Sequence, residues 1–434
     1  MTIRDYPQLL LADKKARVYN VPPLAAAGMK GGHFFRLAAS ELIRLPPASR
    51  FFMLPGRSPV GYNPAVNRYT SLDDRLAVAA FLPPGYTTTY NSAYVELGRP
   101  VPLPLYAYSA ACLYRGNYYA AGVRVDRDAR HDPRLINRRN VRENIQRLRK
   151  VFSPNRLVRH LETCALTYCC PNAQNFFLGR YEAPLPVSPH CNARCGGCIS
   201  FQPGREVAPA QPRIRFVPSP QEIAQAALFH IGRVRDPVVS FGQGCEGEPL
   251  LAADTIEAAI RLIRKETALG VINMNTNASR PGLIARLFDA GLDSIRVSFN
   301  SARAVYYNRY YQPRDYSFGD VVRSLAAAKR KRGFVSINYL TVPGFTDSAD
   351  EFAALGDLLK TGRVDMIQWR NLNCDPLWYF RRLRADVVPD RMIGIRNVIA
   401  SLARSFPRLE MGYFNPSRAR LTRHSATLRA ARRI

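Results

Sequence analysis

The pattern of hydrophobic and polar positions changes near residue 185. Before it, short runs of Tyr, Val, Leu and Phe are separated by Pro and Gly, which is typical of strands joined by turns. The runs 106–112 and 118–125 flank Arg115-Gly116-Asn117 and predict a β-hairpin. Two helices are expected next, at 136–151 and 154–168. The first part of the chain is therefore expected to be β-rich and to end in a helical connector.

Beyond residue 185, apolar runs of strand length alternate with amphipathic stretches of helical length. Ser219 and Glu222 have the spacing of a capping box at one helix start. Strands are expected at 184–189, 238–242, 271–275, 294–299, 334–341 and 364–369, and helices at 219–232, 254–269, 281–290, 318–332, 348–361 and 390–404. This alternation predicts a parallel sheet covered by helices. About six βα units are fewer than the eight of a closed barrel, so the expected α/β fold is a partial (βα)6 TIM-like barrel.

Length and pattern together suggest several domains. A chain of 434 residues corresponds to two or three units of about 150 residues. The expected parts are a β-rich α+β N-terminal domain at 1–135, a Cys-rich helical connector at 136–183, the partial barrel at 184–380, and a basic helix and tail at 381–434. No apolar run approaches the roughly 18 residues of a membrane-spanning helix, and no secretory signal is visible at the amino terminus. A cytoplasmic protein without a membrane partner is expected.

The composition adds a large positive charge. Lys and Arg number 62 against 33 Asp and Glu, a formal charge of +29. Such a charge is compatible with RNA binding. However, 54 of the 62 basic residues are Arg, a skew that coding bias can also produce. RNA therefore stays an alternative that is not favoured, and the charge favours an acidic substrate.

The cysteines gather in the middle of the chain. Cys191, Cys195 and Cys198 have the spacing C-x3-C-x2-C directly after the first expected strand. Three thiolates this close can hold one face of a metal cluster, and Gly196 and Gly197 let the backbone bend around it. The alternative is a zinc site or an ordinary loop, although zinc sites favour paired C-x2-C spacings with His.

This spacing resembles the hallmark of the radical S-adenosylmethionine (radical SAM) superfamily. The resemblance extends over about 184–375, because the ends of the later strands carry segments similar to the family's SAM contacts. The segment 240–250 resembles its Gly-Gly-Glu-Pro motif, although Glu246 stands where the family has Gly. The residues that the resemblance assigns to SAM are Gly247, Glu248, Asn275, Asn277, Ser298, Asn300 and Gly344.

The resemblance implies a catalytic [4Fe–4S] cluster held by Cys191, Cys195 and Cys198, with SAM on the fourth iron. An electron from a flavodoxin- or ferredoxin-type donor would cleave SAM to methionine and a 5′-deoxyadenosyl radical, which takes a hydrogen atom from the substrate. The substrate is an unidentified small molecule, peptide or protein. Two alternatives stay open: a radical SAM enzyme that modifies RNA, and a non-catalytic iron–sulfur or zinc protein that binds a partner.

A second group of candidate ligands precedes the hallmark loop. His160 and Cys164 are four residues apart and share one face of an expected helix, and Cys169 and Cys170 follow its end. This pattern is compatible with an auxiliary metal or cluster site, or with small thiols that fill a helix–barrel interface. Cys245, inside the expected SAM segment, is either a hydrogen-atom donor or a small residue tolerated there.

Overall fold

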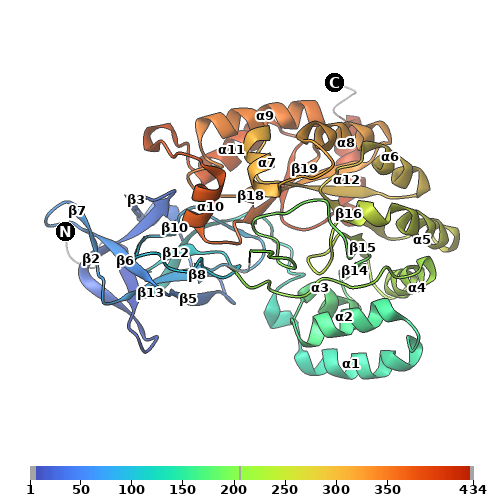
Figure 1. The fold of residues 1–434 in the computed structure, drawn as a ribbon, viewed down its shortest axis with the longest axis horizontal. Coiled ribbons are helices and arrows are strands. Elements are labelled where there is room, and N and C mark those ends of the chain that lie inside the picture. Colours follow the sequence, from blue (N-terminus) through green and yellow to red (C-terminus); the bar gives the residue numbers. More distant parts are fainter. Residues whose placement is uncertain (1–5, 205–206, 431–434) are drawn as a thin grey trace.

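A computed structural model describes residues 6–204 and 207–430, with side chains as far as residue 426. Figure 1 shows two domains side by side, an N-terminal domain of strands on the left and a larger domain of strands and helices on the right. Among the described residues, no helix is both long and apolar enough to cross a membrane.

The N-terminal domain is built on one antiparallel sheet. Its strands are β1 (Gln8–Ala12), β2 (Val18–Lys30), β3 (His33–Arg36), β4 (Leu42–Arg44), β5 (Arg50–Leu54), β6 (Arg57–Asn63), β7 (Arg68–Ser71), β8 (Leu76–Phe81), β9 (Tyr86–Thr88), β10 (Asn91–Ser92), β11 (Tyr94–Glu96), β12 (Ser109–Tyr114) and β13 (Asn117–Arg124). β12 and β13 form the predicted hairpin, in which Tyr114 pairs with Asn117. The long strand β2 pairs with β1, β3, β6 and β10. The β-rich character of this domain is confirmed.

The larger domain contains a parallel sheet of seven strands in chain order. They are β14 (Glu182–Pro184), β15 (Val238–Phe241), β16 (Val271–Thr276), β17 (Ser294–Phe299), β18 (Phe334–Thr341), β19 (Met366–Asn371) and β20 (Glu410–Gly412). The parallel, partial-barrel fold is confirmed, with two differences. β14 is shorter than the expected strand and begins earlier, and β20 adds a strand where only a helix and tail were expected. A three-residue strand has no apolar run that sequence could reveal.

Twelve α-helices belong to the part of the chain that the structure describes. They are α1 (Arg138–Val151), α2 (Arg156–Leu166), α3 (Pro171–Leu178), α4 (Pro220–Ile231), α5 (Ala253–Glu266), α6 (Pro281–Ala290), α7 (Ala304–Tyr311), α8 (Phe318–Arg330), α9 (Ala349–Gly362), α10 (Pro376–Leu383), α11 (Ile395–Ser405) and α12 (Arg418–Ala430). The predicted capping box of Ser219 and Glu222 starts α4. α4, α5, α6, α8 and α9 pack in sequence along the outer side (Figure 1).

Side chains alternate between the two faces of the parallel sheet. Those toward the helices are apolar and share one core with them. Those on the opposite side, which we call the polar face, are Ser240, Asn273, Asn275, Ser294, Arg296, Ser298, Ser336, Asn338, Gln368 and Arg370. Hydrogen bonds join them across strands, such as Ser294 Oγ to Asn273 Oδ1 at 2.8 Å. The sheet therefore offers a hydrogen-bonding surface on the side away from its core.

Buried ion pairs hold the two domains together. Arg57 Nη2 lies 2.6 Å from Asp375 Oδ2, and Lys30 Nζ lies 2.9 Å from Asp347 Oδ2. Asp347 follows β18 and Asp375 follows β19. Asn371, at the end of β19, also accepts a hydrogen bond from the backbone N–H of Thr88 at 2.7 Å. The N-terminal domain therefore packs against the carboxyl ends of these two strands.

Candidate active site

The loop that carries Cys191, Cys195 and Cys198, which we call the cysteine loop, lies at the carboxyl ends of the parallel strands. It belongs to the segment between β14 and α4, and the neighbouring elements hold its backbone. The N–H of Arg194 donates to the carbonyl of Tyr311 at 2.8 Å, and the N–H of Gly196 donates to that of Tyr310 at 3.0 Å. Asn373 Nδ2 donates to the carbonyl of Gly197 at 2.8 Å. α7 and the segment after β19 thus fix the loop from two sides.

The two glycines of this loop lie against side chains of neighbouring elements. A Cβ atom on Gly197 would lie 2.4 Å from Asn373 Oδ1 and 2.6 Å from the hydroxyl of Tyr310. A Cβ atom on Gly196 would lie 2.9 Å from Nε of Arg382. A side chain at either position would therefore have to displace one of these neighbours.

The three thiols form an electrostatically connected group. Burial, followed by the charge of Glu248, raises the pKa of Cys191 to about 11. Burial and then the thiols of Cys198 and Cys191 raise the pKa of Cys195 well above its usual range. Metal ligation requires thiolates and therefore releases these protons. Three soft sulfur donors on one glycine-containing loop fit an iron–sulfur cluster with one iron left to another ligand.

A positively charged side chain, that of Arg213, lies beside the three thiols and belongs to no recognised motif. Arg213 Nη2 is 3.6 Å from Cys198 Sγ, and Arg213 Nε donates to Ser200 Oγ at 3.3 Å. Its guanidinium also lies over the ring of Phe201, 5.1 Å from the centroid. Arg213 therefore adds a hydrogen-bond donor and a positive charge beside this sulfur. The sequence contained no signal for Arg213, since a single Arg in a loop is common.

The segment after β15 is bonded directly to the cysteine loop. The N–H of Gly247 donates to the carbonyl of Ser188 at 2.6 Å, and that of Glu248 to the carbonyl of His190 at 2.8 Å. A Cβ atom on Gly247 would lie 1.9 Å from the carbonyl oxygen of His190. Gly247 therefore allows the two backbones to touch, which brings Glu248 next to the cysteines.

The carboxylate of Glu248 faces the turn after β16. Its oxygens accept hydrogen bonds from the hydroxyl of Thr276 and, at 2.8 Å, from the N–H of Asn277. Burial raises the pKa of Glu248 to about 7. Asn277 in turn donates from Nδ2 to Asn192 Oδ1 at 2.8 Å, inside the cysteine loop. The fold thus brings the cysteine loop, Glu248 and Asn277 together.

Glu246, the residue that departs from the family pattern, has a structural role. One carboxylate oxygen accepts from the N–H groups of Val187 and Ser188 at 2.8 and 3.0 Å, and the other from that of Gln243 at 2.6 Å. Burial raises its pKa to about 7. Glu246 fastens the turn after β15 to the segment after β14, in a way that Gly cannot.

Asn300 occupies a buried position with an unused acceptor. Its Nδ2 donates to the hydroxyl of Tyr379 and to the carbonyl of Tyr306, both at 3.2 Å. Within the part of the chain that the structure describes, its Oδ1 has no hydrogen-bond partner. A fully buried acceptor without a donor is costly, so a donor from a bound molecule would stabilise it.

The other residues assigned to SAM have different surroundings. Asn275 donates from Nδ2 to the carbonyl of Gly242 at 2.9 Å, and the hydroxyl of Ser298 is hydrogen-bonded to Tyr311. Gly344 lies at the domain interface. Its φ is +93°, and a Cβ atom there would be 3.0 Å from the backbone of Lys30. The structure therefore brings Asn275 and Ser298 to the strand ends but places Gly344 against the N-terminal domain.

Two arginines point from the polar face. Arg296 Nη1 donates to Gln368 Oε1 at 3.1 Å, while its Nε has no hydrogen-bond partner among the described residues. Arg370 Nε donates to Asn338 Oδ1 at 3.1 Å. Burial and then the charge of Arg370 lower the pKa of Arg296 to about 9. The alternation of polar residues in these strands is the sequence signal for this surface, and the strand prediction did not use it.

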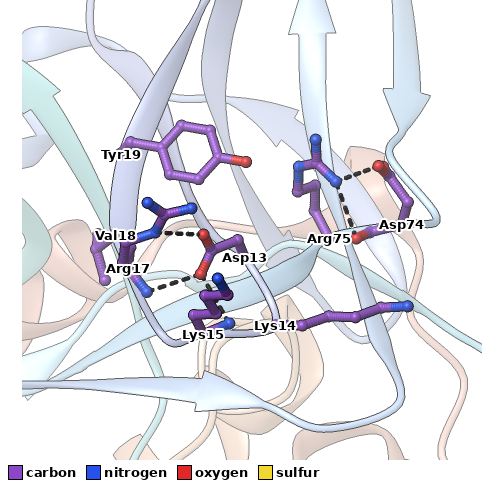
Figure 2. A pocket seen from close by; sticks show the side chains of 8 residues that line it. All are labelled: Asp13, Lys14, Lys15, Arg17, Val18, Tyr19, Asp74 and Arg75. Atoms are coloured by element: carbon purple, nitrogen blue, oxygen red, sulfur yellow. Dashed lines mark hydrogen bonds and ion pairs between the residues drawn. The ribbon is translucent and has the colours of Figure 1, made fainter.

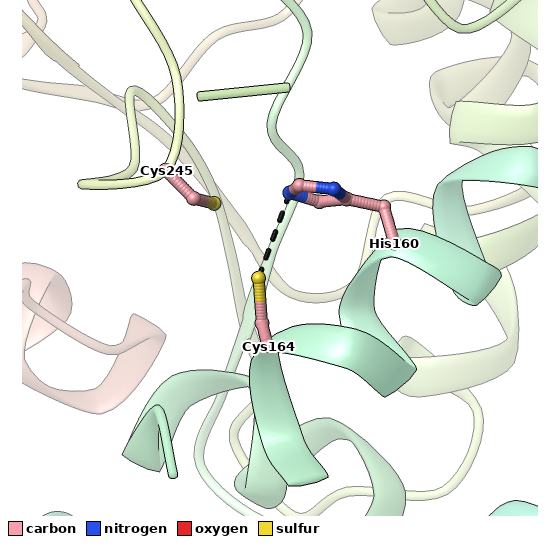
Figure 3. A group of neighbouring side chains, drawn as sticks. All are labelled: His160, Cys164 and Cys245. Carbon is pink, nitrogen blue, oxygen red and sulfur yellow. Dashed lines mark hydrogen bonds between the residues drawn. The ribbon is translucent and has the colours of Figure 1, made fainter. Parts of the chain in front are cut away.

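The expected auxiliary group is only partly assembled as predicted. His160 and Cys164 face each other on α2, as expected, and the third side chain that joins them is Cys245 from the turn after β15 (Figure 3). Cys170 is the N-cap residue of α3, and Cys169 before it has a left-handed φ of 51°.

A pocket on the N-terminal domain lies apart from these groups. Figure 2 shows its lining of Asp13, Lys14, Lys15, Arg17, Val18, Tyr19, Asp74 and Arg75. Its acidic groups are paired, with Arg17 Nε 2.6 Å from Asp13 Oδ2 and Arg75 bonded to Asp74. It contains none of the candidate cofactor residues.

Comparisons with known proteins agree with the site's composition. Residues 185–356 match the family profile described as the radical SAM superfamily. A probable dual-specificity RNA methyltransferase RlmN of Dictyoglomus thermophilum is 24% identical over 158 residues, which cover 35% of this chain and 44% of that relative. The chain thus spans less than half the length of this curated relative.

Two solved structures resemble parts of this chain. The FeFe-hydrogenase maturase HydG from Carboxydothermus hydrogenoformans has 14% identity and a TM-score of 0.36, covering 63% of this chain and 68% of its own. Streptococcus suis SuiB bound to S-adenosylmethionine has 13% identity and a TM-score of 0.36, covering 56% of this chain and 52% of its own.

Proposed function

Because residues 185–356 form a radical SAM domain, we propose that this protein is an enzyme that abstracts a hydrogen atom from an unidentified small molecule, peptide or protein. A domain of this family uses a [4Fe–4S] cluster and SAM. The bound cofactors supply a one-electron cleavage of SAM that yields methionine and a 5′-deoxyadenosyl radical. The observation that carries the proposal is the loop of Cys191, Cys195 and Cys198, bonded directly to the segment of Gly247 and Glu248. These three thiolates would hold the cluster.

The residues around the loop provide the contacts that SAM needs. The carboxylate of Glu248, beside Thr276 and Asn277, accepts hydrogen bonds and favours a positively charged ligand. Asn300 offers its unused Oδ1 to a donor. Together they would orient SAM toward the cysteine loop, because all belong to carboxyl ends of adjacent strands. An electron donor of the flavodoxin or ferredoxin type would supply the reducing electron.

Buried aromatic residues cover one side of the cysteine loop. Tyr310 and Tyr311 of α7 are almost fully buried, and their carbonyls hold the cysteine loop. Tyr379 of α10 packs 5.6 Å from Tyr310 between ring centroids. Buried aromatic rings on this side would keep water away from a reactive radical and so limit side reactions.

The polar face supports an acidic substrate. Arg296 and Arg370 both point from it, and each raises the positive potential at the other. Glu182 is the acidic group that interacts with Arg296, and it is shared with Arg130, whose Nη1 lies 3.2 Å from it. We propose that a carboxylate or phosphate of the substrate binds between Arg296 and Arg370.

The proposed activity is tested with the whole protein under anaerobic conditions. Reconstituted protein with SAM and dithionite should release 5′-deoxyadenosine, and Cys198→Ala should lose both cluster absorbance and cleavage. Cys112→Ala is the matched control, since Cys112 is a buried thiol in β12 of the other domain. An intact cluster without SAM cleavage, or full cluster content in Cys198→Ala, would contradict the proposal.

The anion site is tested with inorganic phosphate. Phosphate should raise the melting temperature of the wild-type protein above that in chloride at equal ionic strength. Arg296→Gln and Arg370→Gln should each reduce this shift. Arg261→Gln, an exposed arginine paired with Glu257 on α5, should not. An equal shift in all three variants would show that phosphate binds elsewhere.

An RNA substrate is the second candidate. The similarity to an RNA methyltransferase and the charge of +29 favour it. RNA binding would weaken steeply with salt, because phosphate contacts release counterions. Affinity for total RNA that does not change between about 50 and 200 mM salt would exclude this candidate.

A further inference from the structure

Three metal-binding side chains meet outside the cysteine loop. His160 and Cys164 lie on one face of α2, and Cys245 reaches them from the turn between β15 and η4 (Pro249–Ala252). One ligand atom from each lies within 4.8 Å of the other two. Figure 3 shows the three side chains pointing toward one another. Cys164 and Cys245 are only 2% and 4% exposed, so both thiols are shielded from solvent, while His160 is partly exposed.

The separations fit a single ion. His160 Nε2 lies 3.5 Å from Cys164 Sγ. In a tetrahedral zinc site with Zn–S of about 2.3 Å and Zn–N of about 2.0–2.1 Å, these two atoms stand about 3.6 Å apart. Thiolates at the corners of a cubane cluster bind different irons and therefore stand farther apart than thiolates that share one ion. A mononuclear site is thus favoured over an auxiliary cluster.

Cys170 is the candidate for a fourth donor, while among the described residues the ligand atoms within 4.8 Å of one another are those of His160, Cys164 and Cys245. The N–H of Cys170 donates to the carbonyl of Cys164 at 3.0 Å. The Cys170 thiol interacts electrostatically with the thiols of both Cys164 and Cys245. Three thiolates and one imidazole are a common ligand set of structural zinc sites, which are closed by four protein ligands.

We propose that His160, Cys164, Cys170 and Cys245 bind one zinc ion. The ion would link the helical connector to the turn after β15. This turn carries Cys245 and, shortly after it, Gly247 and Glu248, whose N–H groups bond the segment of the cysteine loop. Zinc has no redox chemistry and would therefore stabilise this turn without competing with electron transfer. The zinc site itself does not depend on the proposed function, because its occupancy is measured without turnover.

Metal analysis of the intact, cluster-loaded protein tests the site. The wild-type protein should contain about one zinc in addition to about four irons per chain. His160→Ala and Cys245→Ser should each lose the zinc and keep the iron. Cys169→Ser is the matched control, since it changes the neighbouring cysteine and should retain zinc, whereas Cys170→Ser should lose it.

Cobalt provides a second measurement that does not need the variants to be equally stable. Zinc-depleted wild-type protein, reloaded with Co²⁺, should show the thiolate-to-cobalt absorption of a tetrahedral sulfur site. Wild-type protein that takes up neither zinc nor Co²⁺ overturns the proposal. So does a disulfide between Cys164 and Cys245 in freshly reduced protein, or zinc that persists in both His160→Ala and Cys245→Ser.

Discussion

Two buried glutamates two residues apart carry out different tasks. Glu246 accepts three backbone hydrogen bonds and holds the turn, while Glu248 faces Thr276 and Asn277 at the strand ends. Burial raises the pKa of each to about 7. Burial affects the two carboxyl groups alike. Their hydrogen-bond partners decide which of them supports the fold and which faces the candidate site.

The ionisation of Glu248 should control SAM binding. Its pKa of about 7 means that the carboxylate forms as pH rises through neutrality. SAM carries a sulfonium charge, so its affinity should increase about tenfold from pH 6 to pH 8. Glu248→Gln should bind SAM more weakly at pH 8 and show little pH dependence. Calorimetric titration of the cluster-loaded protein at both pH values measures this. An unchanged pH dependence in the variant would assign it to another group.

Residues close in sequence were the predictable part of the site. The cysteine loop and the Gly247-Glu248 segment are local patterns, and the structure places the two segments in contact. The spacing within 160–170 pointed to Cys169 and Cys170 as further ligands beside His160 and Cys164. Cys245 joins the group only through tertiary packing, which local spacing does not report. Spacing reports which side chains share a helix face, but not which loop covers that face.

At the level of elements, the buried central strands were predicted well, because each has a run of apolar residues bounded by turns. Most of the misses are short elements, and the longest is the helix α12 in the expected tail. α7 starts at Ala304, and its N-cap residue Arg303 makes no side-chain cap, so no start signal was present. β20 has the sequence Glu410-Met-Gly412 and exists only because β19 offers it an edge. The structure of such elements depends on neighbours, not on local pattern.

The cysteine loop should not tolerate a methyl group at Gly197. Gly197→Ala places Cβ within 2.6 Å of both Asn373 and Tyr310. We expect a loss of about 1–3 kcal/mol of stability and reduced iron content after reconstitution. Gly356→Ala, in α9 with no atom near the new Cβ, is the control and should keep its iron. Equal iron content in the two variants would show that the loop adapts.

α12 should be anchored in a pH-dependent way. Burial alone would lower the pKa of His424, but hydrogen bonds to Asp365 and Glu410 raise it to about 9. The charged imidazole therefore stabilises the folded state fully below about pH 6.5, and this contribution is lost as pH rises through 9. The melting temperature of the wild-type protein should exceed that of His424→Gln most at pH 6. A constant difference up to pH 10 would contradict the assignment.

On the scale of the whole molecule, the N-terminal domain is part of the barrel's rim. Its Lys30 and Arg57 pair with Asp347 and Asp375, and both aspartates follow barrel strands. This relation was not visible in the sequence, where the partners of each pair lie over 300 residues apart. We propose that this domain limits access to the strand ends and so helps to select the substrate.

Breaking one of these pairs should loosen both domains. Arg57→Ala leaves Asp375 buried without its cation, which costs about 3–5 kcal/mol. Limited proteolysis should then cut between the domains faster than in the wild-type protein. Arg381→Ala removes an exposed partner of Glu96 and should cost less than about 1 kcal/mol. Similar digestion rates for both variants would show that the buried pair does not hold the interface.

The contact between Asn373 and Gly197 also has a consequence in time. The two residues are 176 positions apart. At about 5–20 residues per second, the ribosome adds Asn373 roughly 9–35 s after Gly197. During that interval the cysteine loop has emerged without the residue that later holds it. A growing chain therefore presents its thiols to the assembly machinery, and to oxidants, before the mature fold surrounds them.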